Sequence, residues 1–205
     1  MSAKQDRRVE RTKRDLKNSI LHLIQEKQDL NRISITEIVE KANYNRGTFY
    51  AHYTDKVALL NEIMEEAIDG FIEAFRKPYH EKSMLDLHSM SATVIKIFDH
   101  VEQNASIYSL LFNNKIFPGF QQTLCYSLEK VFSKEIAFQD HAMEKINKDL
   151  YIRSQCFSII GMLDLWIERN FEFSSKYMTS QLLEISNYKP INFKITKSKG
   201  QNESK

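Results

Sequence analysis

The chain has 205 residues, 42% of them hydrophobic and 27% charged, and its formal net charge is +2. That length and composition suit one domain or two small ones with a real apolar core, and they exclude disorder over most of the chain. Five glycines and three prolines leave too few turn positions for an all-β sandwich or barrel, so we expect an all-α protein.

A first amphipathic helix is predicted between Arg8 and Gln28. Four apolar residues in this stretch recur at helical spacing and would form one buried stripe: Leu16, Ile20, Leu23 and Ile24. Five basic residues come at or before the start of this stripe: Arg7, Arg8, Arg11, Lys13 and Arg14. Side chains of this kind could lie over the phosphates of a polyanion.

A second, short helix is predicted to begin after Ser34 and to run to about Ala42. The Ser34 hydroxyl can accept from the amide of Glu37, whose carboxylate can accept from the amide of Ser34, so the two form a capping box. Asn43 then occupies the break. Asparagine tolerates the left-handed backbone that a tight turn between helices requires.

A third helix is predicted from Arg46 to about Tyr53, with Asn45 as its cap. Thr54 or Asp55 would cap a fourth helix, which stops at 76–78, an Arg-Lys-Pro run. Two short helices joined by three or four residues, with a longer amphipathic helix in front, form the layout of a helix-turn-helix.

The third helix carries side chains suited to reading DNA. Gly47 makes its first turn thin, and because glycine in a helix costs about 1 kcal/mol relative to alanine, helix stability does not explain it. Phe49 and Tyr53 share a face and would pack inward. The remaining side chains would face the major groove: Arg46, Thr48, Tyr50 and His52. The alternative is a small helical domain with core aromatics and solvated polar residues.

Charge is distributed unevenly along the chain. Residues 1–56 hold 12 basic and 8 acidic residues, residues 57–188 hold 12 and 18, and residues 189–205 hold 5 and 1. The corresponding net charges are +4, −6 and +4. A basic end on an acidic body favours contact of that end with a polyanion, although a charge run is more often a solvated face.

The segment 33–60, ISITEIVEKANYNRGTFYAHYTDKVALL, resembles the DNA-binding region of the TetR/AcrR family of bacterial transcriptional regulators. Its most specific parts are Asn-Arg-Gly-Thr-Phe-Tyr at 45–50, His-Tyr at 52–53 and Asp-Lys at 55–56. Three positions depart from the usual pattern: Val39, Asn43 and Ala51. The last removes one candidate contact to DNA.

The resemblance implies a set of residues that bind double-stranded DNA. Tyr50 and Lys56 would bind phosphates, and Arg46 and Thr48 would face bases or nearby phosphates. Phe49 and Tyr53 would be packing residues. The whole predicted DNA-binding set is Ser34, Thr36, Tyr44, Asn45, Arg46, Thr48, Tyr50, His52 and Lys56.

Beyond Pro78 the periodicity predicts further helices at 85–101, 105–112, 121–136, 148–169 and 176–188. We therefore divide the chain into four parts. Residues 1–56 form a helix-turn-helix domain with a basic N-terminal arm, and 57–78 a connecting helix. Residues 79–190 form an effector-binding and dimerisation domain, and 191–205 a disordered basic tail.

The C-terminal part, through the stretch 160–167 and the final short helix, resembles a subgroup of the same family that includes regulators of dihydroxyacetone kinase operons. The resemblance implies a homodimer held by two long helices from each subunit, here 148–169 and 176–188. It also implies a small-molecule effector pocket, for which the candidates are Phe98, Tyr108, Phe112, Cys125, Phe157 and Trp166. Plain core packing is the favoured alternative for these side chains.

Other chemistries find little support. The histidines form no HxxxH pair, so we expect no metal site, and Cys125 and Cys156 are expected to be reduced, buried thiols. No glycine-rich phosphate loop and no nucleophile elbow are present, so we expect neither an enzyme nor a cofactor. No apolar run approaches the roughly 18 residues that cross a bilayer, and no signal peptide begins the chain, so we expect a cytoplasmic protein without a membrane partner.

The predicted function is a homodimeric transcriptional repressor that a small-molecule effector releases from a palindromic operator. Two alternatives remain open. One is a DNA-binding adaptor without an effector, whose body recruits a protein partner. The other is a helical enzyme or ligand carrier that has kept the DNA-binding head.

Overall fold

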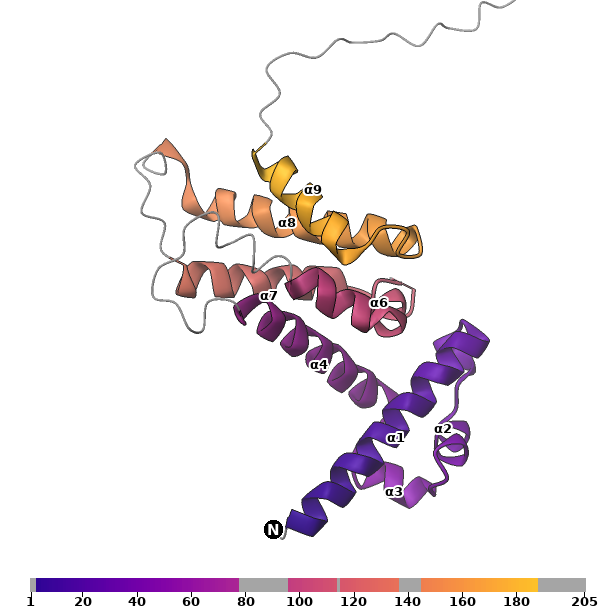
Figure 1. Ribbon diagram of the computed structural model, residues 1–205. Coiled ribbons are helices and arrows are strands. Elements are labelled where there is room, and N and C mark those ends of the chain that lie inside the picture. The colour runs from indigo at the N-terminus through magenta and orange to yellow at the C-terminus, as the bar shows by residue number, and fades with distance from the viewer. Residues whose placement is uncertain (1–2, 78–95, 114, 137–144, 188–205) are drawn as a thin grey trace, which may run out of the picture.

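The structure is a computed structural model, and it describes residues 3–77, 96–113, 115–136 and 145–187 (Figure 1). The regular elements within these ranges are all helical, which confirms the all-α prediction. Two predictions lie outside the described residues: the helical segment 85–95 and the disordered tail at 191–205.

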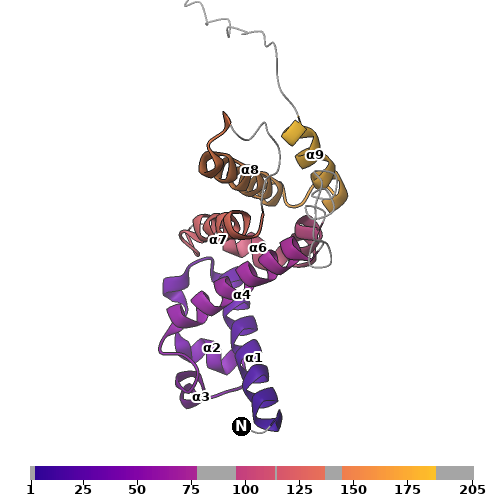
Figure 2. The ribbon, with the colours of Figure 1, turned by 90° about the vertical axis from the view of Figure 1, so that its left-hand side faces the viewer.

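The N-terminal helices form a head at one end of the molecule (Figures 1 and 2). It consists of α1 (Ala3–Lys27), the short 3-10 helix η1 (Leu30–Arg32), α2 (Ile35–Lys41) and α3 (Arg46–Tyr50). The predicted apolar stripe of α1 is buried, as expected. The helix begins before Arg8, because the polar residues ahead of it continue the helix without joining its stripe.

Side-chain caps fix where the short helices begin. Ser34 and Glu37 form the predicted capping box, with the Glu37 amide 3.2 Å from Ser34 Oγ and the Ser34 amide 2.9 Å from Glu37 Oε2. Asn45 Oδ1 accepts from the Thr48 amide at 2.9 Å, and Asp55 caps α4 in the same way. The three predicted helix starts are therefore confirmed, and Asp55 is the cap of α4.

The turn between α2 and α3 has the predicted left-handed residue, because Asn43 has a φ of 60°. The third helix is shorter than predicted and ends at Tyr50 instead of near Tyr53. The amides of His52 and Tyr53 both donate to the carbonyl of Phe49, at 3.0 and 2.9 Å, so the ladder of hydrogen bonds does not advance further.

Helix α4 (Lys56–Arg76) runs from the head into the body (Figure 1). Close to the head, Glu62 on α4 binds Lys13 and Lys17 of α1, at 3.1 and 2.7 Å. At the other end, the ring of Phe75 lies 5.1 Å from that of Phe132 on α7. One apolar cluster runs through the head, α4 and the body, so this helix is packed into both parts.

The body stacks its helices in layers on α4 (Figures 1 and 2). Residues 96–103 are helical and lead into α6 (Ala105–Leu111), α7 (Phe120–Glu135), α8 (Lys148–Glu168) and α9 (Ser175–Asn187). The bounds of α6, α7, α8 and α9 agree with the predicted helices to within one residue, and the helix at 96–103 ends two residues beyond the predicted end at 101. Helices α6 and α7 lie between α4 on one side and α8 and α9 on the other.

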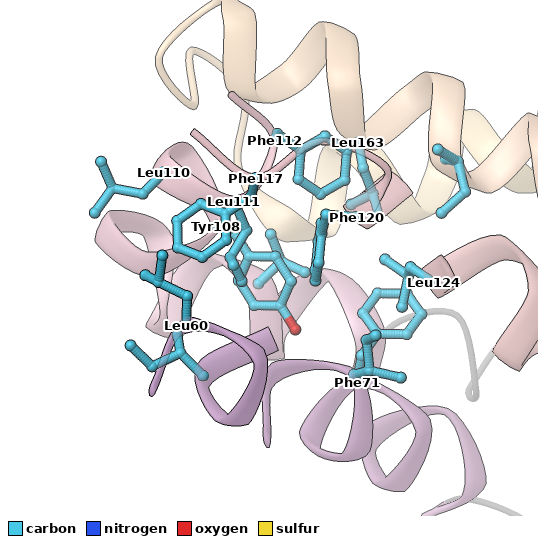
Figure 3. Packing of buried hydrophobic residues seen from close by; sticks show 14 of the residues in the cluster. Leu60, Phe71, Tyr108, Leu110, Leu111, Phe112, Phe117, Phe120, Leu124 and Leu163 are labelled. Carbon is cyan, nitrogen blue, oxygen red and sulfur yellow. The ribbon is translucent and has the colours of Figure 1, made fainter. Parts of the chain in front are cut away.

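Aromatic side chains fill the space between these layers (Figure 3). The rings of Phe112 and Phe120 lie 5.7 Å apart, and both neighbour Tyr108. The indole of Trp166 donates to the carbonyl of Phe173 at 2.9 Å, which holds the turn into α9. No helix in the described part of the chain is long and apolar enough to cross a membrane.

Candidate nucleic-acid interface

Helix α3 lies at the outer end of the head and presents one face to solvent (Figure 1). Phe49 is fully buried and Tyr53 is 4% exposed, so these two aromatics anchor the helix as predicted. Arg46, Gly47 and Tyr50 are exposed. The buried anchors thus fix which side chains of α3 a duplex can reach.

The first turn of α3 is capped by a side chain and has no Cβ at Gly47. Asn45 caps it, and the hydroxyl of Thr48 donates to the same Oδ1 of Asn45 at 3.2 Å. Gly47 lacks a Cβ, and a Cβ there would lie 3.2 Å from this oxygen, which is a tight contact. The glycine therefore leaves both the cap and the approach of another molecule unobstructed.

Arg46 and Tyr50 form an exposed pair one helical turn apart. The guanidinium carbon lies 5.9 Å from the centre of the tyrosine ring, and Nη2 lies 3.4 Å from the tyrosine hydroxyl. A guanidinium held in this way keeps donors free for a base edge or a phosphate, while the tyrosine hydroxyl can donate to a phosphate oxygen. This pair is the strongest candidate contact on the head.

The other predicted contacts on this surface are half-buried or already hydrogen-bonded, except Thr36. Thr48 and His52 are half-buried, and the imidazole of His52 stacks at a tilt against Tyr53, 6.4 Å between ring centres. Ser34 and Thr36 are exposed at the start of α2. The Ser34 hydroxyl is already used in the capping box, so Thr36 has the freer side chain of the two.

Two predicted contacts point into the head instead. The hydroxyl of Tyr44 donates to Asp15 Oδ2 at 3.1 Å, and the ring packs against the core. The ammonium of Lys56 donates to the carbonyls of Leu30 and Ile33, at 2.8 and 3.0 Å. These bonds tie the start of α4 to η1, and they leave the third proton of the Lys56 ammonium for the predicted phosphate contact, which stays a prediction.

Six of the basic residues on α1 fall into two groups. Lys13 and Lys17 form ion pairs with Glu62 on α4 and so bridge the two helices. Burial alone would lower the pKa of Lys17, but its hydrogen bonds to Glu62 and Glu66 outweigh burial and raise that pKa. The remaining four are exposed arginines within α1: Arg7, Arg8, Arg11 and Arg14.

The predicted effector pocket is not formed by its candidate residues. Five of the six are core side chains with at most 7% exposure: Phe98, Tyr108, Phe112, Cys125 and Trp166. Phe157 is 53% exposed on the outer face of α8 and does not line the interior. The burial of the five fits the favoured alternative, core packing, although Tyr108 also lines a groove beside α1, and Phe157 lies on a surface.

The two cysteines are free and buried, as predicted, but they are also neighbours. Burial, and then the adjacent Cys125, raise the pKa of Cys156 to about 12. Cys125 Sγ lies 3.8 Å from Glu129 Oε1, and Arg153 covers that carboxylate at 2.7 Å. Protonated, enclosed thiols of this kind are poor nucleophiles. Among the described residues, no group of His, Cys, Asp and Glu side chains could hold a metal ion.

The sequence reasoning missed an apolar surface on α8 and α9. Large apolar side chains are at least 45% exposed there: Leu150 at 71%, Phe157 at 53%, Leu165 at 49%, Tyr177 at 45% and Ile185 at 50%. A signal was present, since α8 has apolar residues on more than one face. A helix that is apolar on both faces is typical of one buried between two neighbours.

Two family models match the chain. The model described as bacterial regulatory proteins of the tetR family matches residues 23–63, which contain α2, α3 and the start of α4. A model described as a transcriptional regulator C-terminal region matches residues 88–188. The first match covers the candidate interface, and the second covers most of the body.

A curated relative matches at 22% identity over 176 residues, which are 85% of this chain and 44% of the relative. It is the HTH-type transcriptional regulator YxbF of Bacillus subtilis, strain 168. The chain therefore spans less than half the length of that relative.

Solved structures of regulators share the fold. A TetR regulator from Streptococcus agalactiae is 23% identical with a TM-score of 0.58, over 88% of this chain and 96% of that one. A TetR-family regulator from Syntrophomonas wolfei is 18% identical with a TM-score of 0.66, over 85% and 92%. The dihydroxyacetone kinase operon activator DhaS is 19% identical with a TM-score of 0.58, over 85% and 93%.

Proposed function

The chain belongs to the TetR family of transcriptional regulators, and we propose from this membership that it is a sequence-specific DNA-binding regulator without enzymatic activity. The observation that carries the proposal is the arrangement of α3. Phe49 is buried beneath it, and Arg46, Gly47 and Tyr50 are exposed on it. Such a helix can enter the major groove with its N-terminal turn foremost.

The proposed contacts divide by chemistry. Arg46 donates to a base edge, since a guanidinium can bond both O6 and N7 of a guanine. Tyr50, Thr36 and two exposed arginines of α1, Arg7 and Arg8, bind phosphates and set the register of the head on the duplex. Thr48 and His52 are half-buried, and their exposed parts contact the duplex from the side of α3.

The protein acts as a homodimer through α8 and α9. The exposed apolar residues of these helices form the surface that a second subunit would cover, with Phe157 and Leu165 two helical turns apart on α8. Gly161 lies between them, and a Cβ there would meet nothing within 4 Å, so the face is open at its middle. A two-fold dimer places two heads about 34 Å apart, which suits a palindromic operator in the cytoplasm.

Regulation would follow from the coupling of head and body through α4. We propose that the protein represses transcription and that a small-molecule effector releases it. An effector that binds one arrangement of the heads better than the other shifts the population toward that arrangement. Because α4 is packed into both parts, a change of its tilt would alter the spacing of the two heads.

Selection of duplexes from a random pool tests the proposal. We expect a palindrome whose half-sites are one helical turn apart, with binding that weakens steeply as salt concentration rises. Arg46→Ala and Tyr50→Phe should weaken binding to the selected site, while Tyr126→Phe, on the exposed side of α7, should not. Recovery of no preferred sequence, with salt-insensitive binding, would reject the proposal.

A second function is favoured by one observation, the tight packing of the predicted pocket residues in the body. In this reading the protein is a DNA-binding adaptor whose body recruits a protein partner instead of an effector. The two can be told apart with operator-bound protein and a fractionated cell extract. Release by the small-molecule filtrate supports the effector, and release by the protein fraction alone supports the adaptor.

A further inference from the structure

A groove of about 820 Å³ lies where the head meets the body, between α1, α4, residues 100–104 and α6. None of the predicted pocket residues except Tyr108 lines it. Its volume is within the range of about 300–1,000 Å³ that small-molecule sites occupy. The groove belongs to neither part alone, because its walls come from both.

The floor of the groove is apolar. Leu21 of α1 faces Ile63 and Ala67 of α4, and Ile107 and Tyr108 of α6 complete the surface. Leu21, Ala67 and Ile107 are only partly buried, so apolar area remains open to solvent. A ligand with an apolar portion would remove this area from water, which is favourable by about 25 cal/mol per Å².

The inner end of the groove carries hydrogen-bonded polar groups. The Tyr108 hydroxyl donates to the carbonyl of Ala67 at 3.0 Å, and His100 Nε2 lies 3.0 Å from the same hydroxyl. With the Tyr108 proton on the bond to Ala67, the neutral His100 tautomer that carries its proton on Nε2 completes the chain. This chain of bonds joins α4 to α6 behind the groove.

One side of the groove carries a stripe of arginines. Arg7, Arg11 and Arg14 lie on the face of α1 that continues to Asn18 and Leu21, and all five line the groove. Arg11 is 3.8 Å from Asp15, in an exposed pair that contributes little. Arg7 and Arg14 form no ion pair within the described part of the chain.

The opposite wall offers these arginines no free carboxylate. Glu66 is the acidic residue on that wall, and Lys17 already binds it. The other acidic lining residues, Asp6 and Glu10, are on α1 itself, beside the arginines. Guanidinium groups therefore stand over an apolar floor without a counter-charge across the groove.

We propose that this groove binds an amphiphilic organic anion, such as a medium-chain carboxylate, with its apolar part on the floor and its anionic group against Arg11 and Arg14. The inference deepens the proposed function, because it gives the effector a site and a chemical class. The ligand would touch α1 of the head and α6 of the body at once. Its binding would favour one angle between them, and so one spacing of the two heads.

Calorimetric titration of the full chain with decanoate tests the site directly, without DNA. Decan-1-ol and decylammonium share its apolar chain and serve as neutral and cationic controls. The double variant Arg11→Ala/Arg14→Ala removes the proposed anion contacts. The matched control is Arg8→Ala/Arg32→Ala, since both of these arginines are exposed and neither lines the groove.

We expect decanoate to bind one site per subunit, and the alcohol and the amine to bind at least about tenfold more weakly. The Arg11/Arg14 variant should lose about tenfold in affinity for decanoate, and the Arg8/Arg32 variant should lose none. Asn18→Trp fills the groove from an exposed position and should abolish binding, with an unchanged circular-dichroism melting curve showing that it folds.

The proposal is overturned if decanoate does not bind at millimolar concentration, if the three probes bind equally, or if both arginine pairs have the same effect. The effect of decanoate on binding to the selected duplex is measured separately. Binding of decanoate by a protein that ignores all duplexes would reject the regulator and keep the site. DNA binding without decanoate binding would reject only the site.

Discussion

A Cβ atom at Gly47 would lie 3.2 Å from Oδ1 of Asn45, the oxygen that caps α3. From the sequence we interpreted this glycine as room for the approach of DNA. The structure adds a second role, because the missing Cβ leaves the Asn45 cap undisturbed. The two explanations make different predictions for Gly47→Ala. Loss of the cap would lower the stability of the head, whereas loss of clearance would lower only DNA affinity.

For Gly47→Ala we expect the free energy of unfolding to change by no more than about 1 kcal/mol, because the helix propensity of alanine offsets the strain on the cap. Affinity for the selected duplex should fall at least about tenfold, since a methyl group stands at the DNA-facing turn. Urea unfolding and fluorescence anisotropy measure the two quantities. Full affinity in a stable variant would show that the duplex does not approach this turn.

Arg46 should act as a base contact and Tyr50 as a phosphate contact. Arg46→Ala is expected to cost about 1–3 kcal/mol of binding and to relax the preference at one position of each half-site. Tyr50→Phe should weaken all sequences alike, because the lost hydroxyl reads no base. Repeating the duplex selection with each variant checks this division. A selected site that is unchanged for Arg46→Ala would reassign the arginine to the backbone.

The capping box gives the head a defined acid sensitivity. Hydrogen bonds from Lys27, then from the Ser34 amide and hydroxyl, lower the pKa of Glu37 from 4.5 to about 2. Because the folded pKa lies below the unfolded value, the stabilisation is complete above pH 4.5 and is lost as pH falls toward 2.

Glu37→Gln keeps a capping side chain but removes this charge. We expect the variant to be less stable than the parent at pH 7 and to approach it as the pH falls from 4.5 toward 2.5. Thermal unfolding across this range measures the difference, and carbon-detected NMR of the Glu37 carboxyl measures its pKa. A difference that is constant over the whole range would contradict the assignment.

Local interactions explain what the sequence predicted well. The caps of Ser34, Asn45 and Asp55 act within three residues, so their pattern can be read from neighbouring letters. The inward orientation of the Tyr44 and Lys56 side chains depends on distant partners. These partners are Asp15, Leu30 and Ile33, more than twenty residues away in the sequence. No local pattern contains that information, and the same holds for the groove between α1 and α6.

Phe157 shows a different limit of prediction from sequence. Its helical spacing fits a core position as well as an outer one, because α8 carries apolar residues on both faces. Only the packing of α7 on one side of α8 shows which face the chain itself covers, and Phe157 is on the other. An apolar residue left outside in this way indicates an interface instead of a pocket.

The exposed face of α8 should therefore control assembly. Phe157→Glu places a charge in the proposed dimer surface, where it would be buried without a partner. We expect sedimentation equilibrium to give the mass of one subunit for this variant and of two for the parent, at micromolar concentration. Tyr126→Glu introduces the same charge at a similarly exposed aromatic of α7 and should remain dimeric. If both variants stay dimeric, another surface joins the subunits.

The bond from Tyr108 to Ala67 should contribute to the rigidity of the joint between α4 and α6. Tyr108→Phe removes the hydroxyl and leaves His100 Nε2 and the enclosed carbonyl of Ala67 each with one partner fewer. We expect a loss of about 1–3 kcal/mol in the free energy of unfolding by urea. Tyr126→Phe, the same change at an exposed residue, should cost nothing measurable. Faster amide exchange confined to α4 and α6 in Tyr108→Phe would assign the loss to this joint, whereas an unchanged stability would show that the bond is replaced by water.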